Sequence, residues 1–202
     1  MDKQKGEDRF VKIILLGEPG VGKTSIINRY INNEFNIDSP STYGSAFTTK
    51  VIEKNNVRYF VNVWDTSGQE KYHSVTSLFI NGSHIVILVY AIDSKDSFEG
   101  LEFWYNSLKE KLEGESYVLA IVGSKSDLID KEDIPEEEGK KFAEEKNAIF
   151  KLVSAKQDPE GINKLFDSLL NELIRGKNYD VRAESIAISR PSKIKKPKKG
   201  FC

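Results

Sequence analysis

The chain has 202 residues, enough for one α/β domain with its own buried core and an appendage. It holds a single cysteine, so no intramolecular disulfide can form, and this usage suits a reducing compartment. The net charge of −1 divides into +6 for residues 185–202 and −7 for residues 1–184. This asymmetry argues against a nucleic-acid-binding domain and for a basic tail that seeks anionic surfaces. The charged N-terminus does not resemble a signal peptide, and no apolar stretch approaches the ~20 residues of a membrane span.

In chain order, short apolar runs alternate with helical patterns, which predicts a mostly parallel sheet with helices on both faces. We expect an α/β fold with six strands, at 9–16, 46–53, 57–64, 85–90, 118–122 and 149–153. The second and third strands should form an antiparallel hairpin, because Asn55 and Asn56 suit the positive φ of a tight turn. Helices are expected at 24–33, 97–113, 135–146 and 160–175.

The predicted organisation has three parts. Residues 1–8 form a flexible N-terminus, and residues 9–176 form the domain. After Arg175 the hydrophobic periodicity stops, so residues 177–202 are expected to be a disordered basic tail.

A phosphate-binding loop is the strongest motif. Residues 17–24 read Gly-Glu-Pro-Gly-Val-Gly-Lys-Thr, which fits G-x-x-x-x-G-K-[ST] between a predicted strand and a predicted helix. The glycines let backbone N–H groups surround phosphate oxygens, and the helix N-terminus adds partial positive charge. We expect Lys23 to reach the β- and γ-phosphates and the Thr24 hydroxyl to ligate Mg²⁺.

Two later segments follow predicted strands. In residues 65–70, Asp65 could hold Mg²⁺ through water, the Gly68 amide could meet a terminal phosphate, and Gln69 could orient an attacking water. A plain polar loop explains this segment equally well. In residues 123–127, Asp127 could accept two hydrogen bonds from guanine, a donor pair that adenine lacks. An ordinary βα turn is the alternative here.

In order and spacing these segments resemble the Ras superfamily of small GTPases over residues 8–175. Residues 64–70 (Trp-Asp-Thr-Ser-Gly-Gln-Glu), residues 71–76, Leu88-Val89-Tyr90 and Trp104 are similar to the Rab family. The resemblance implies that Thr42 reaches Mg²⁺ and the γ-phosphate, and that Phe35 packs edge-on against guanine. From the sequence alone, Phe35 could also be a core residue at a helix end.

The resemblance implies a switch that binds GTP or GDP with Mg²⁺ and slowly hydrolyses GTP, with Gln69 and Lys23 as catalytic residues. A nucleotide-binding scaffold with weak or no hydrolysis is the alternative. The expected metal ligands are Thr24, Thr42 and Asp65. The expected nucleotide-binding residues are Gly20, Val21, Gly22, Lys23, Thr24, Ser25, Phe35, Thr42, Gly68, Ser124, Lys125, Asp127, Ser154, Ala155 and Lys156. The expected partners are effector, exchange-factor and GTPase-activating proteins, acting on a monomer.

Several positions depart from the family pattern. Ser124 stands where most relatives have an asparagine that bonds the base and ties the base loop to the phosphate loop. A serine offers fewer bonds, so we expect faster nucleotide release. Pro19 supplies no backbone N–H in the phosphate loop, and Ser67 replaces the usual alanine beside Gly68.

The sequence of the tail predicts attachment to a membrane. Six basic residues and no acid precede Cys202 within residues 185–202. Rab proteins carry geranylgeranyl groups on C-terminal cysteines, usually two, whereas this chain has one. A prenyl chain and a lysine cluster together supply two membrane signals. We therefore expect the protein on the cytoplasmic face of an intracellular membrane, cycling with the cytosol. A solvated charged tail is the alternative.

Overall fold

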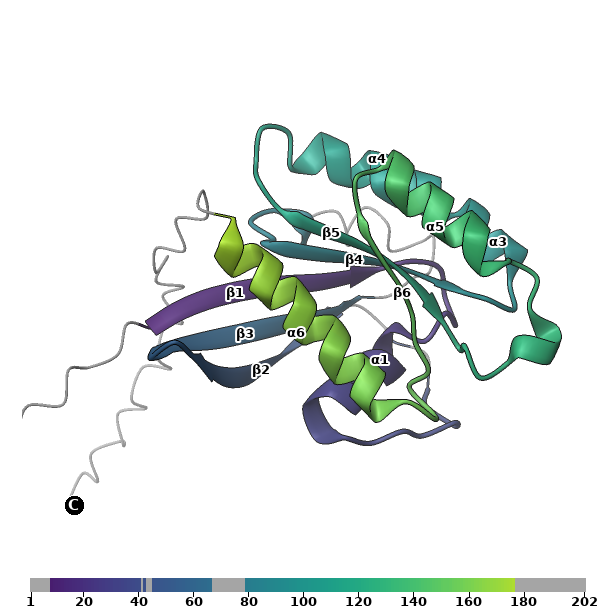
Figure 1. Cartoon of the computed structure of the whole chain (residues 1–202), viewed down its shortest axis with the longest axis horizontal. Helices are drawn as coiled ribbons and strands as arrows, with labels where there is room; N and C mark the ends of the chain where they lie inside the picture. The colour runs from purple at the N-terminus through teal and green to yellow at the C-terminus, as the bar shows by residue number, and fades with distance from the viewer. Residues whose placement is uncertain (1–7, 41, 43–44, 67–78, 177–202) are drawn as a thin grey trace, which may run out of the picture.

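A six-stranded sheet forms the centre of the protein (Figure 1). The computed structural model describes residues 8–40, 42, 45–66 and 79–176. The strand order across the sheet is β2-β3-β1-β4-β5-β6, and only β2 and β3 pair antiparallel. The strands are β1 (Asp8–Leu16), β2 (Ser45–Lys54), β3 (Val57–Thr66), β4 (Ile85–Ala91), β5 (Val118–Ser124) and β6 (Ile149–Leu152). This confirms the predicted α/β fold.

Helices cover both faces of the sheet (Figure 1). The helices α1 (Lys23–Asn32) and α6 (Pro159–Arg175) pack on one face, and α6 buries six apolar side chains there. On the other face lie α3 (Lys95–Glu99), α4 (Leu101–Lys111) and α5 (Glu136–Glu145). A single 3-10 turn, η2 (Ile129–Lys131), follows β5.

The two hydrophobic cores follow from the two-residue period of the strands. On β1, Ile13 and Leu15 face the core under α1 and α6, whereas Ile14 and Leu16 face the core under α4 and α5. Every residue of β4 and of β5 is buried, as expected for strands covered on both sides. The core under α6 includes Phe166, whose ring stacks on Tyr30 at a centroid distance of 3.8 Å.

The β2–β3 hairpin turns where its sequence predicts. Asn55 and Asn56 have φ values of 53° and 60°. Both values lie in the left-handed region that a type I′ turn requires and that asparagine tolerates. The turn sets the register, in which Lys54 pairs with Val57 and Phe47 with Trp64.

One predicted helix is wrong in detail. The pattern at 97–113 predicts a single helix, but the structure has α3 and α4, separated at Gly100. The structure also begins α3 earlier than predicted, with Ser94 as its N-cap. The Ser94 hydroxyl accepts a hydrogen bond from the backbone N–H of Ser97 at 3.3 Å, and such a cap is not part of the hydrophobic periodicity. At Gly100 the backbone passes close to the phosphate loop, and a Cβ there would lie 2.9 Å from the Glu18 side chain.

The sheet brings the predicted motifs to one edge. Strands β1, β3, β5 and β6 run parallel to one another, so their carboxyl ends meet. The phosphate-binding loop follows β1, and Asp65 is the second-last residue of β3. Ser124 ends β5, and Ser154 follows β6.

Candidate functional site

The phosphate-binding loop owes its shape to glycine. Gly17 has φ of 146°, and a Cβ there would lie 2.1 Å from the carbonyl oxygen of Val89. Gly22 has φ of 91° and caps α1 without a side-chain hydrogen bond. The first turn of α1 also contains no acid, so its free N–H groups and dipole favour an anion.

Lys23 lies inside this loop. The residue is 5% exposed, and its Nζ donates to the carbonyl oxygens of Gly17 at 2.7 Å and Glu18 at 2.8 Å. Burial lowers the pKa of Lys23 to about 8, although the nearby carboxylates of Asp65 and Glu18 act in the opposite direction. A buried ammonium with so little compensating charge favours a bound anion such as a phosphate group.

Three oxygen-bearing side chains converge beside Lys23. Thr24 on α1 donates to Asp65 Oδ2 at 2.8 Å, and its hydroxyl lies 2.8 Å from that of Thr42. Thr42 also donates to Asp65 Oδ2 at 3.3 Å. Burial raises the pKa of Asp65, opposed by the Thr24 bond and the Lys23 charge. Within the described part of the chain, Asp65 Oδ1 is buried without a hydrogen-bond partner.

This cluster fits a hard cation. An unpaired carboxylate oxygen and two hydroxyls are the ligand type that Mg²⁺ prefers. Among the described residues, no three His, Cys, Asp or Glu side chains gather closely enough to hold a metal. The candidate metal position therefore depends on the two threonines as well as on Asp65.

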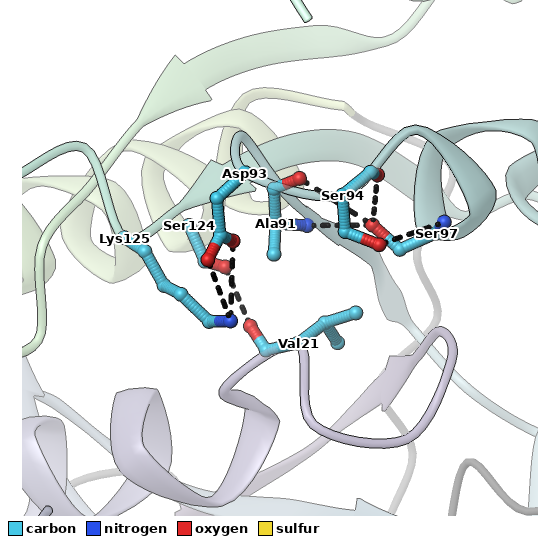
Figure 2. A network of polar contacts seen from close by, with 7 residues as sticks. All are labelled: Val21, Ala91, Asp93, Ser94, Ser97, Ser124 and Lys125. Carbon is cyan, nitrogen blue, oxygen red and sulfur yellow. Dashed lines mark hydrogen bonds and ion pairs between the residues drawn. The ribbon is translucent and has the colours of Figure 1, made fainter. Parts of the chain in front are cut away.

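The loop after β5 is tied to its neighbours (Figure 2). Ser124 is 2% exposed, and its hydroxyl donates to the Val21 carbonyl of the phosphate loop at 2.5 Å. Lys125 has φ of 59°, and its Nζ lies 3.2 Å from Asp93 Oδ1. The tie that we expected serine to weaken is therefore present, in the form of one hydrogen bond.

Asp127 is held by the loop after β6. The Ser154 hydroxyl donates to Asp127 Oδ1 at 2.6 Å and accepts from the Gln157 backbone N–H at 3.0 Å. The Ala155 carbonyl accepts from Arg29 Nε on α1 at 2.7 Å. These bonds connect both predicted base loops to the helix that begins at the phosphate loop.

A cleft of about 440 Å³ joins these features. The predicted residues that line it are Gly20, Gly22, Lys23, Thr24, Ser25, Phe35, Thr42, Ser124, Lys125, Asp127, Ala155 and Lys156. Val21, Asp65 and Ser154 are not in the lining and reach it through the hydrogen bonds described above. Gly68 and Gln69 lie outside the described residues. Phe35 is half-buried, lines the cleft and also packs against the core, so both of its expected roles remain open.

The comparison with known proteins decides the family. A family model described as the Ras family matches residues 12–175. This chain belongs to the Ras family. Human Ras-related protein Rab-17 is 36% identical over 177 residues, which cover 88% of this chain and 82% of the relative. The GTP-binding protein ypt3 of Schizosaccharomyces pombe is 36% identical over 168 residues, 83% of this chain and 78% of ypt3. Ras-related protein RGP2 of Oryza sativa subsp. japonica is 35% identical over 182 residues, 89% of this chain and 83% of that relative.

These relatives make the chain a Rab-like small GTPase and confirm the resemblance read from its motifs. Ras-family GTPases bind guanine nucleotide and Mg²⁺ and work with regulators and effectors. In the described part of the chain, no helix has the length and apolarity to cross a membrane.

Sequence reasoning missed two contacts of this GTPase. Asp93, in the loop after β4, pairs with Lys125 across 32 residues of chain. Trp104 on α4 is 1% exposed and donates its indole N–H to Glu18 Oε1 at 3.0 Å. The closeness of Gly100 to Glu18 belongs to the same contact. No local pattern marks either pair, although an acid within a phosphate loop is itself a signal that a partner is needed.

An aromatic row begins on the β2–β3 hairpin and continues to Phe79. Phe47 of β2 stacks on Trp64 of β3 with centroids 4.9 Å apart, and Trp64 lies 5.3 Å from Phe79. Phe47 is 50% exposed, whereas Trp64 and Phe79 are partly buried against the core under α4 and α5. Phe47 lies five residues after Thr42, and Trp64 immediately precedes Asp65. The row is therefore close in the chain to two of the candidate metal ligands.

Proposed function

We propose that this protein is a Rab-type molecular switch that binds GTP with Mg²⁺, hydrolyses it slowly to GDP and recruits effectors in vesicle trafficking. The observation that carries the proposal is the convergence of three parts on one cleft. These parts are the phosphate-binding loop with Lys23, the oxygen cluster around Asp65, and the base loop with Asp127.

In this proposal, GTP hydrolysis is catalysed by positive charges and N–H donors held in position around the phosphates. Lys23 is already fixed by two carbonyl oxygens, so it can meet phosphate oxygens without reorganisation. The free N–H groups at the start of α1 add donors that point to the same place. Thr24, Thr42 and Asp65 would hold Mg²⁺, which supplies positive charge against the β- and γ-phosphates when bound.

Guanine selection is assigned to Asp127. Its Oδ1 is oriented by Ser154, and a carboxylate can accept from both N1–H and N2–H₂ of guanine. Phe35 lines the same cleft and offers an apolar surface for the base. We assign Gln69 to the attacking water. Among the described residues no arginine lines the cleft, so we expect an external activating protein to supply one for the transition state.

We assign effector binding to the aromatic row Phe47–Trp64–Phe79. Since Thr42 precedes β2 and Asp65 is the second-last residue of β3, a change at the γ-phosphate can alter the position of Phe47 and Trp64 through the hairpin. An exposed aromatic side chain such as Phe47 is typical of interface centres. Membrane attachment is assigned to a prenyl group on Cys202 together with the basic residues of 185–202, on the cytoplasmic face of an intracellular membrane.

The test is single-turnover hydrolysis of GTP by the purified protein with and without Mg²⁺, beside direct measurement of GDP binding. We expect tight binding, slow hydrolysis and loss of hydrolysis in the chelator. Asp65→Asn should weaken the Mg²⁺ dependence, whereas Asp130→Asn, at an exposed acid on η2, should not. Tight binding without hydrolysis would replace the switch by a nucleotide-binding scaffold, and absence of binding would refute the proposal.

A further inference from the structure

Ser124 has only one proton to donate. A hydroxyl carries a single O–H, unlike a side-chain amide with two N–H bonds. Here that proton is directed to the Val21 carbonyl, 2.5 Å away in the phosphate loop (Figure 2). Both residues are almost completely buried, at 2% and 1% exposure. The hydroxyl also faces the turn at Gly22, where an added Cβ would lie 3.9 Å from Ser124 Oγ.

Guanine has two kinds of polar edge. Its N1–H and N2–H₂ are donors, which suit the Asp127 carboxylate. Its O6 and N7 are acceptors and need donors from the protein. Ser124 cannot meet either acceptor while it donates to Val21, since its remaining lone pairs only accept.

Rotation of the hydroxyl towards a base would break the tie to the phosphate loop. The Val21 carbonyl would then lose this donor in a buried position, which costs more than one neutral hydrogen bond gains. The neighbouring lysine is also engaged, because Lys125 Nζ lies 3.2 Å and 3.5 Å from the two oxygens of Asp93 (Figure 2). The side chains of Ser124 and Lys125 are thus both directed to protein partners.

We infer that this GTPase selects guanine through the Asp127 edge and does not read N7 of the base. Ser124 fixes the phosphate loop and leaves the N7 acceptor to water. The protein therefore binds 7-deazaguanine nucleotides, in which a C–H replaces N7, as tightly as the natural nucleotides. This inference rests on the proposed function, because it concerns the same cleft.

The experiment compares GDP with 7-deaza-GDP on the full chain with Mg²⁺, by displacement of a fluorescent GDP. For the wild-type protein we expect dissociation constants within about twofold of each other. A preference of more than about threefold for GDP, the effect of one hydrogen bond, would overturn the inference. Absence of binding by both nucleotides would refute the proposed function and the inference with it, so the two failures are distinguishable.

Two variants identify Ser124 as the cause. Ser124→Asn provides a second donor, so its affinity for GDP should exceed that for 7-deaza-GDP by about three- to tenfold. Equal affinities in this variant would contradict the role of donor number. Ser124→Ala removes the tie to Val21, so both nucleotides should weaken by the same factor; a selective loss of GDP affinity would show that the hydroxyl reads the base. The wild-type comparison needs no substitution and decides the matter even if a variant fails to fold.

Discussion

The buried lysine of the phosphate loop makes the stability of the nucleotide-free protein depend on pH. Lys23 has a pKa of about 8 in the folded protein, against an ordinary value of 10.5. Between these values the unfolded chain binds more protons than the folded one, so the free energy of unfolding rises with pH. The rise between about pH 7 and pH 9.5 is about 2 kcal/mol for a single group with these two pKa values.

The assay is urea unfolding of protein stripped of nucleotide and Mg²⁺, measured across that pH range. Other ionisable groups also contribute to the pH dependence of stability, so the quantity of interest is the difference between wild type and Lys23→Met. Lys164→Met, on the exposed surface of α6, serves as the control and should behave like wild type. Added GDP should flatten the wild-type profile, because phosphate charge keeps Lys23 protonated. Identical pH profiles for wild type and Lys23→Met would refute the reasoning that burial destabilises this ammonium.

Three further changes test the site and a fourth tests the tail. Asp127→Asn should lower GTP affinity roughly 100-fold or more, since two charge-assisted bonds are lost, and raise affinity for xanthine nucleotides; unchanged GTP affinity would remove Asp127 from base recognition. Gln69→Leu should slow single-turnover hydrolysis about tenfold or more while GTP binding stays nearly intact, and an unchanged rate would contradict its role. Trp104→Phe should lower the free energy of unfolding by about 2 kcal/mol and speed GDP release, because Glu18 loses its indole donor, with no change in release counting against the contact. Deleting Cys202 should release the protein from membranes in cells without affecting nucleotide binding, and mass spectrometry of native protein that finds an unmodified thiol on the membrane-bound form would exclude the lipid.

Periodicity along the chain determined most of the fold. A continuous apolar run such as residues 85–90 is stable only as a strand that is buried on both faces. The apolar stripe on α6 is likewise stable only when it packs against the sheet. The turn at Asn55 and Asn56 follows from the φ values those residues tolerate. The phosphate-binding loop was equally readable, because its function is carried by backbone geometry within eight consecutive residues.

Only the tertiary structure decided which side chains meet across long stretches of sequence. Ser124 and Val21 lie 103 residues apart, and Trp104 and Glu18 lie 86 apart. Such pairs depend on where parallel strands place their carboxyl ends and on how closely α4 approaches the phosphate loop, and neither leaves a periodic signal. From the sequence alone, Ser124 can only be described as shorter than asparagine and able to form fewer hydrogen bonds. Its neighbours decide that its one proton goes to the phosphate loop, because a buried carbonyl lies within reach.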